Sequence, residues 1–178
     1  MLKSIFHRQI RKMEARYGYD ASHVHEILDI STAAFLKFAM FQFMSMDRKS
    51  VPKDAWYAAC LAGALGEDCG PCAQLVVDMA VGDGVPAKTI AALLRGDVNI
   101  TDASLGFRYE VAVASRNPEI ATLVDEVTKR FSKRGLVSLD FSVTSSRVYP
   151  CLKRGMGHGI ASVKLKVASE TIPVKQAA

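Results

Sequence analysis

Long uninterrupted apolar runs are missing from this sequence. The most apolar early stretch, residues 31–46 (STAAFLKFAMFQFMSM), is interrupted by Lys37 and Gln42. It falls short of the ~18 uncharged apolar residues that indicate a membrane span. The basic N-terminal stretch, residues 1–19, is interrupted by charged residues before it forms the apolar segment of a secretory signal. We therefore expect no membrane span and a cytoplasmic location.

A long tract of one charge is missing as well. Lysine and arginine outnumber aspartate and glutamate by 23 to 18, which gives a net charge of +5. The clustered basic residues form two separate groups, within residues 3–16 and 129–134, and residues 52–125 carry more acidic than basic side chains. Basic and aromatic residues do not alternate as they do in proteins that stack on bases. We expect no nucleic-acid partner.

Cysteine and histidine are scarce, with four of each among 178 residues. Four cysteines in a chain of this length exclude a disulfide-rich scaffold. Hydrophobic residues make up 49% and charged residues 23%, which allows a full core and excludes global disorder. The length suits one domain with an appended arm.

Apolar residues recur at steps of three and four along most of the chain, which predicts helices. The predicted helices cover residues 3–17, 21–46, 53–65, about 69–80, 86–96, 103–115 and 119–135. In the second of these, one buried stripe is expected from His23, Ile27, Ile30, Ala34, Phe38 and Phe41. We expect an all-α fold. The methionines and phenylalanines of residues 38–46 are expected in the core or in a subunit interface.

Residues 136–148 (LVSLDFSVTSSRV) alternate as a strand does, but no partner strand is near and all preceding segments are helical. A helix over 136–156 is therefore favoured. The tail after Gly157 is expected to be an extended arm or partly disordered. We divide the chain into an N-terminal helical arm (1–48), a core (49–157) and a C-terminal tail (158–178).

Two cysteines stand three residues apart in GEDCGPCAQLVVDMA, residues 66–80. At the start of a helix, unpaired N–H groups and the helix dipole stabilise a thiolate on the first cysteine. The second cysteine lies about one turn on, where it can attack a mixed disulfide. Helix position thus predicts Cys69 as the nucleophile and Cys72 as the resolving thiol, in a pair that cycles between dithiol and disulfide.

Two other interpretations of the pair stay open. Zinc requires four ligands, and Cys60, Cys151 and His158 are available although none forms a second close pair. Both cysteines can also be small buried hydrophobic residues. A thioredoxin fold is rejected, because the preceding residues 55–68 (AWYAACLAGALGED) are typical of a helix rather than a buried strand.

From Val51 to about Met156 the chain resembles the alkylhydroperoxidase D and carboxymuconolactone decarboxylase superfamily. The likeness rests on DAWYAACLAGALGEDCGPCAQLVVDMAVGDGVPAKTIAALLRGD and on the later FRYEVAVASRNPEIATLVDEVTKRF. The resemblance implies an all-helical bundle that assembles into a homo-oligomer, a dimer, trimer or hexamer. It also implies that a cysteine pair reduces peroxides or partner disulfides, that a thiol reductant protein restores the pair, and that no cofactor is needed. In such proteins the second cysteine reacts with peroxide, so the roles of Cys69 and Cys72 stay open.

The sequence departs from this family at two places. Redox members carry a histidine four residues after the second cysteine, where this chain has Val76, and a glutamate about twelve residues before the first, where it has Tyr57. The usual Glu–His relay therefore cannot be transferred. Glu67 is the nearest substitute base, although an acidic residue before a helix also complements the helix dipole. Tyr57 is a candidate hydrogen-bond donor to a thiolate, or a core aromatic.

Two further functions compete with redox chemistry. The decarboxylase branch of the resemblance implies acid–base residues and no cysteines. Histidine is the obvious acid–base group, but His7, His23 and His25 lie in the predicted N-terminal arm and His158 in a glycine-rich loop. A non-redox enzyme on the same fold is thus the weaker alternative. The third alternative is a non-catalytic helical oligomer.

Overall fold

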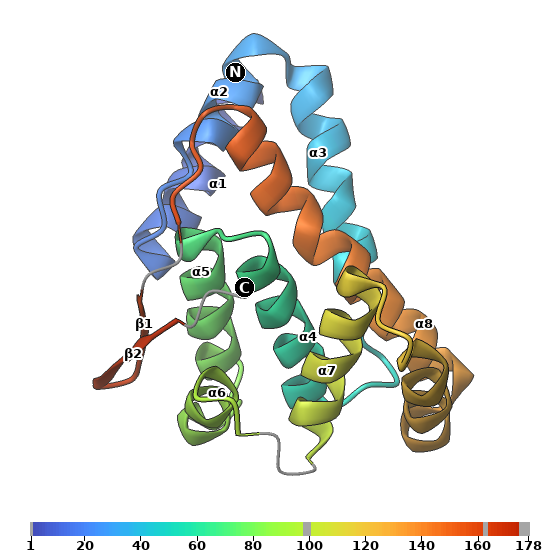
Figure 1. The fold of residues 1–178 in the computed structure, drawn as a ribbon. Helices are drawn as coiled ribbons and strands as arrows, with labels where there is room; N and C mark the ends of the chain where they lie inside the picture. Colours follow the sequence, from blue (N-terminus) through green and yellow to red (C-terminus); the bar gives the residue numbers. More distant parts are fainter. Residues whose placement is uncertain (1, 98–100, 162–163, 175–178) are drawn as a thin grey trace.

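The computed structural model describes residues 2–97, 101–161 and 164–174, and within them the chain forms helices and one short hairpin (Figure 1). The elements are α1 (Leu2–Tyr17), α2 (Ser22–Ile30), α3 (Thr32–Ser45), α4 (Lys53–Gly66), α5 (Gly70–Gly82), α6 (Ala87–Leu94), α7 (Asp102–Ser115), α8 (Ile120–Gly155), β1 (Lys164–Val167) and β2 (Glu170–Pro173). The two strands pair with each other, antiparallel. The predicted all-α fold is confirmed.

The centre of the molecule is α4, whose residues from Ala55 to Ala64 are all buried. It packs against α5, α7 and α8. Small side chains allow these close approaches: a Cβ on Gly106 of α7 would lie 2.2 Å from the carbonyl oxygen of Ala55. The helices can therefore bury a large apolar surface in a short chain.

A second layer, formed by α1, α2, α3 and the end of α8, lies at the top of Figure 1. It has its own apolar cluster, which includes Ile10, Leu28 and Phe35, with Leu152 of α8 and Met156 just after it packed against it. Lys153 of α8 is buried there, with Nζ 3.1 Å from the carbonyl oxygen of Asp20.

The single helix predicted over 21–46 is wrong, because the chain breaks at Ser31. Ser31 is extended (φ −154°, ψ 115°) and its hydroxyl accepts a hydrogen bond from the Ala34 N–H, which caps α3. The break redirects the second half of the segment. His23 and Ile27 are buried as expected, whereas Ile30 and Phe41 are 74% and 41% exposed.

The helix predicted over 136–156 is confirmed as the second half of α8, after a local break at Ser132 (φ 67°). The polar residues that make this segment alternate like a strand include serines that are buried in the helix packing. Ser138, Ser142 and Ser145 are buried on the face of α8 that also buries Leu139 and Val143. The Ser142 hydroxyl lies 3.1 Å from the thiol of Cys60 and 3.5 Å from the carbonyl oxygen of Trp56, both on α4.

The tail is a docked hairpin over residues 164–173, so the expected extended or disordered arm is wrong there. Leu165, Val167 and Ile172 are buried in the main core. The side-chain amide of Gln74 on α5 holds β1 at both backbone groups of Lys166, at 2.8 and 2.9 Å. The last residues of the predicted tail, 175–178, lie outside the described residues.

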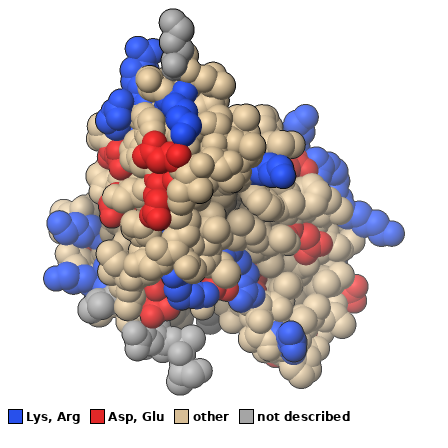
Figure 2. Space-filling view, turned by 90° about the horizontal axis from the view of Figure 1, so that it is seen from above, with Lys and Arg blue, Asp and Glu red and all other residues tan. Residues whose placement is uncertain are grey.

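Among the described helices, none combines the length and the apolar composition that crossing a membrane requires. On the face seen in Figure 2, basic and acidic side chains are interspersed between uncharged areas. The described residues on this face therefore form no continuous basic surface of the kind that tracks a nucleic-acid backbone.

Candidate functional site

A tight turn between α4 and α5 positions the first cysteine. Asp68 adopts a left-handed conformation (φ 50°), and the Cys69 N–H donates to the carbonyl oxygen of Ala64 at 3.2 Å. These features end α4 and start α5 within three residues. Pro71 lies in the first turn of α5, where a missing N–H costs nothing. Cys69 is thus the N-cap residue, and Cys72 is the third residue of the helix.

The structure joins Cys69 and Cys72 in a disulfide, with their Cα atoms 5.2 Å apart. Both residues are buried, at 3% and 7% exposure, and both belong to the main core cluster. The pair predicted from the sequence is therefore brought together at the start of α5. Val76, at the position of the relay histidine in the resembled family, is partly buried against the same core.

The first turn of α5 leaves one N–H donor suited to the side chain of Cys69. Gly70 donates to the carbonyl oxygen of Ile160 at 2.9 Å, and Pro71 has no N–H. An N-cap side chain accepts from the second or third residue of its helix, which here leaves the N–H of Cys72. After reduction, a Cys69 thiolate would accept that hydrogen bond at the positive end of the helix dipole, which stabilises its negative charge.

A cavity of about 250 Å³ lies beside Cys69. Its lining comes from the α4–α5 turn, from the end of α8 and from the segment before β1: Glu67, Asp68, Cys69, Pro150, Arg154, Gly159, Ile160 and Ala161. Cys69 is the cysteine of the pair that contributes to this lining.

Glu67 lies at this cavity, but it is held by two arginines of α8. Arg147 donates to its Oε1 at 2.6 and 2.8 Å, and Arg154 donates to its Oε2 at 2.8 Å. Burial raises the pKa of Glu67, but hydrogen bonds from Arg154 and Arg147 and their charges outweigh burial, so its pKa is lowered. A carboxylate with a lowered pKa is a weak base. Glu67 therefore fits better as the anchor that holds the arginines at the cavity.

Tyr57 is not brought to the cysteines. Its hydroxyl donates to Oδ2 of Asp83 at 3.3 Å, and Arg48 donates to the same oxygen at 2.5 Å. Asp83 caps the C-terminus of α5 whereas Cys69 caps its N-terminus. The length of α5 separates the two sites by about 20 Å. Tyr57 therefore has no direct contact with the thiols, and its ring serves the core, where it is 5% exposed.

Sequence reasoning missed Glu110, a carboxyl group buried between α4, α7 and α8. Glu110 is 1% exposed, and neither carboxyl oxygen has a hydrogen-bond partner among the described residues. Oε1 would lie 3.0 Å from a Cβ on Gly63, and Ser146 borders the same space. Burial raises the pKa of Glu110 to about 7, with Arg147 opposing and Glu67 adding to the rise. No sequence signal marked Glu110, because nothing in the sequence shows that its position on α7 is buried.

The zinc ligands considered from the sequence lie in separate places. The thiol of Cys60 is buried beside Ser142, Cys151 is exposed, and His158 pairs with Glu26 at 2.9 Å. Across residues 2–97, 101–161 and 164–174, no group of three or more His, Cys, Asp or Glu side chains is arranged to hold a metal ion. Cys69 and Cys72 are bonded to each other in a disulfide instead.

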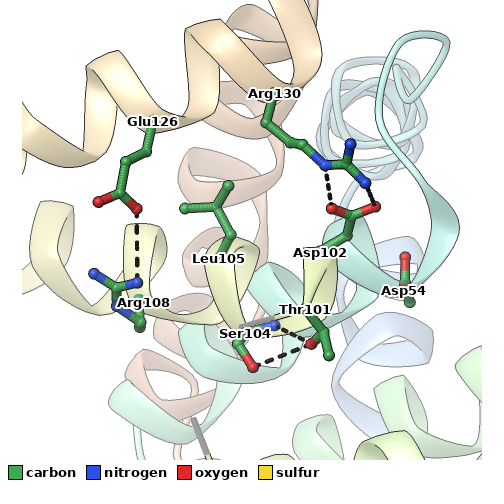
Figure 3. Close-up of a pocket in the computed structure, with 8 residues that line it drawn as sticks. All are labelled: Asp54, Thr101, Asp102, Ser104, Leu105, Arg108, Glu126 and Arg130. Atoms are coloured by element: carbon green, nitrogen blue, oxygen red, sulfur yellow. Dashed lines mark hydrogen bonds and ion pairs between the residues drawn. The ribbon is translucent and has the colours of Figure 1, made fainter. Parts of the chain in front are cut away.

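A larger cavity of about 480 Å³ lies near the start of α7 and is lined by ion pairs (Figure 3). Arg130 holds both carboxylate oxygens of Asp102 at 2.6 and 3.0 Å, and Arg108 lies 3.6 Å from Glu126. The hydroxyl of Thr101 caps α7. These side chains bind one another, and the lining contains neither cysteine nor histidine, so the cavity beside Cys69 is the better candidate site.

Comparisons with models of protein families, with curated proteins and with solved structures give no match. The resemblance to the alkylhydroperoxidase D and carboxymuconolactone decarboxylase superfamily therefore stays a prediction. The chemistry of the site has to be argued from its own geometry.

Proposed function

We propose that this chain is a cysteine-dependent oxidoreductase that reduces a peroxide or a partner disulfide through Cys69 and Cys72. The observation that carries the proposal is the Cys69–Cys72 disulfide at the start of α5, with Cys69 in the lining of a cavity. Cysteine pairs at helix starts have the electrostatic setting that favours a reactive thiolate. A purely structural crosslink would not need such a cavity beside one sulfur.

In the proposed cycle, the Cys69 thiolate attacks a peroxide oxygen, the O–O bond breaks, and the leaving alkoxide takes a proton to become an alcohol. Cys69 is then a sulfenic acid. The thiol of Cys72 attacks its sulfur, the S–O bond breaks and water leaves, which gives the disulfide seen in the structure. A thiol reductant protein supplies two electrons and two protons and restores the dithiol.

The arginines of α8 have a defined place in this cycle. Arg154 lines the cavity and is fixed by the carbonyl oxygen and the carboxylate of Glu67, at 2.8 Å each. A fixed cation in the lining of this cavity would stabilise both a thiolate and the anionic leaving group. Glu67 thus acts by holding Arg154 rather than by taking a proton. The assembly into a homo-oligomer and the cytoplasmic location expected from the sequence belong to the same proposal.

Turnover with peroxide and dithiothreitol tests the proposal in three variants. Cys69→Ser and Cys72→Ser should each abolish turnover, whereas the matched control Cys151→Ser, at an exposed cysteine outside the disulfide, should keep it. Full turnover in the Cys69→Ser/Cys72→Ser double variant would refute the redox proposal. Turnover of a lactone by that double variant would favour the decarboxylase alternative, and inactivity of the wild type in all these assays would favour a non-catalytic oligomer.

A further inference from the structure

Two histidines meet where α1 packs against α2, at the upper left of Figure 1. Nδ1 of His7 on α1 lies 2.6 Å from Nδ1 of His25 on α2. The planes of the two rings are 18° apart and their centroids are 4.9 Å apart, so the edges that carry these nitrogens face each other. The side chains are 19% and 22% exposed, so the pair lies within the helix contact and can still be reached from solvent.

The outer nitrogen of each ring faces a carboxylate. Nε2 of His7 lies 2.9 Å from Oδ1 of Asp29, and Nε2 of His25 lies 3.2 Å from Oε2 of Glu14. A carboxylate only accepts hydrogen bonds, so each Nε2 donates its proton and the tautomer of each ring is fixed. Glu14 is itself held, because its Oε1 accepts from the Ala21 N–H at 3.0 Å. Both rings are therefore positioned with Nδ1 toward the other ring.

The space between the two Nδ1 atoms calls for a cation. In a neutral imidazole that donates through Nε2, Nδ1 carries a lone pair and no proton. Two such lone pairs 2.6 Å apart repel each other unless a cation lies between them. A single proton leaves one of the two carboxylate charges unbalanced, whereas a divalent metal ion balances both. Lys3 binds the carbonyl oxygen of Asp29, with Nζ at 3.0 Å.

We propose that His7 and His25 bind one divalent transition-metal ion, such as Zn²⁺, through their Nδ1 atoms. Imidazole nitrogen is a preferred ligand of zinc, copper and nickel. Histidines that bind a metal almost always donate their other ring N–H to a carboxylate, carbonyl or water, and both histidines do so here. This pattern on both rings is what distinguishes the pair from a single histidine–carboxylate contact.

The geometry allows the ion with a small movement. Two Zn–N bonds of about 2.0–2.1 Å in a tetrahedral site place the nitrogens roughly 3.3 Å apart. The gap between the Nδ1 atoms of His7 and His25 must therefore widen by less than about 1 Å, which rotation of partly exposed side chains permits. With two protein ligands, water fills the other positions, as it does in zinc sites that stay open. This proposal does not depend on the redox function.

A zinc titration of the oxidised protein tests the site. The protein is dialysed against EDTA and titrated with zinc chloride in a calorimeter. The disulfide keeps Cys69 and Cys72 from competing for the metal, and a Cys151→Ser background removes the exposed thiol. The parent protein should bind one equivalent of zinc, and His7→Gln and His25→Gln should each lose that binding.

Two further variants separate this site from general histidine binding. Asp29→Asn should weaken zinc binding by about 10–100-fold, because it replaces the carboxylate behind His7. His158→Gln is the matched control, since His158 also holds a carboxylate, that of Glu26 at 2.9 Å, but lies outside α1 and α2. It should leave zinc binding unchanged, and circular dichroism should show that all variants are folded.

NMR of the protein without histidine substitutions locates the ion independently of the variants. Zinc should shift the ring resonances of His7 and His25 and leave those of His158 in place. If the protein binds no zinc, the proposal is overturned and the cation between the rings is a proton. Zinc binding that survives in both His7→Gln and His25→Gln would overturn it as well.

Discussion

The cysteines of this chain sit in distinct environments, and their reactivity is expected to follow those environments. After reduction of the disulfide, Cys151 should react first with a maleimide because it is exposed. Cys69 should follow, because it contributes to the lining of a cavity whereas Cys60 is buried. Cys60 should react last, since burial raises the pKa of its thiol to about 12.

Timed alkylation with peptide mapping by mass spectrometry measures this order. Cys151→Ser removes the fast phase and provides the control. Labelling of Cys60 in the native protein before Cys69 would contradict the arrangement of α4 and α8 described above.

Glu110 is expected to make the stability of the protein depend on pH. Its pKa rises from the usual 4.5 to about 7 on folding, so the folded state binds more protons than the unfolded state between these values. The contribution of this group to stability is therefore greatest below about pH 4.5 and is lost as pH rises through 7, a change on the order of 3 kcal/mol. Glu110→Gln should remove most of that slope, as measured by chemical unfolding at pH 5 and pH 8.

Glu119→Gln is a suitable control for this experiment, because Glu119 is exposed before α8. It should leave the difference between pH 5 and pH 8 as in the wild type. If the free energy of unfolding of Glu110→Gln depends on pH as strongly as that of the wild type, the carboxyl of Glu110 is solvated or paired.

At the scale of elements, the contact of α4 with α7 depends on glycine. A Cβ on Gly106 would meet the backbone of Ala55, which cannot rotate away. Gly106→Ala should therefore lower the free energy of unfolding by about 1–3 kcal/mol or more, despite the better helix propensity of alanine. Gly82→Ala at the end of α5 meets nothing within 4 Å and should be neutral or stabilising by up to about 1 kcal/mol. Thermal unfolding of both variants decides this, and equal melting temperatures would contradict the close approach.

The docking of the C-terminal hairpin on α5 depends on Gln74. Removing its amide in Gln74→Ala deletes both hydrogen bonds to the backbone of Lys166, each worth about 0.5–1.5 kcal/mol. Hydrogen exchange should become faster in β1 and β2 and stay unchanged in α4. Gln9→Ala, at an exposed position of α1, is the control. Unchanged hydrogen exchange in β1 would contradict the role of Gln74 in holding the hairpin on α5.

The elements also show how far the sequence predicts this fold. Helical spacing gave the helices from α4 to α8 nearly at their observed bounds, because each has a buried face. The break at Ser31 was missed, since apolar residues continue on both sides and only the serine side chain marks the new start. The hairpin was missed because its strands are four residues each and gain stability by packing on α5.

At the scale of the whole molecule, the candidate site unites distant segments. The sequence identified Cys69, Cys72 and Glu67, which are neighbours in the chain. Arg147 and Arg154 lie 80 and 87 residues from Glu67, and only the packing of α8 along α4 brings them to it. Tyr57 was predicted near the thiols because it stands close to them in the sequence. Helix α4 instead carries it toward the far end of α5, where its hydroxyl donates to Asp83. Local motifs are visible in a sequence, whereas their surroundings depend on helix packing.

The reaction of the reduced protein with one equivalent of peroxide shows whether Cys69 and Cys72 form a redox centre. Free thiols are counted and the intact and peptide masses are measured before and after the reaction. We predict the loss of two thiols and about two mass units, a crosslink that maps to Cys69–Cys72, and reversal by dithiothreitol. If Cys69 and Cys72 stay reduced and are slow to alkylate, the pair is not a redox centre and the proposed function is wrong.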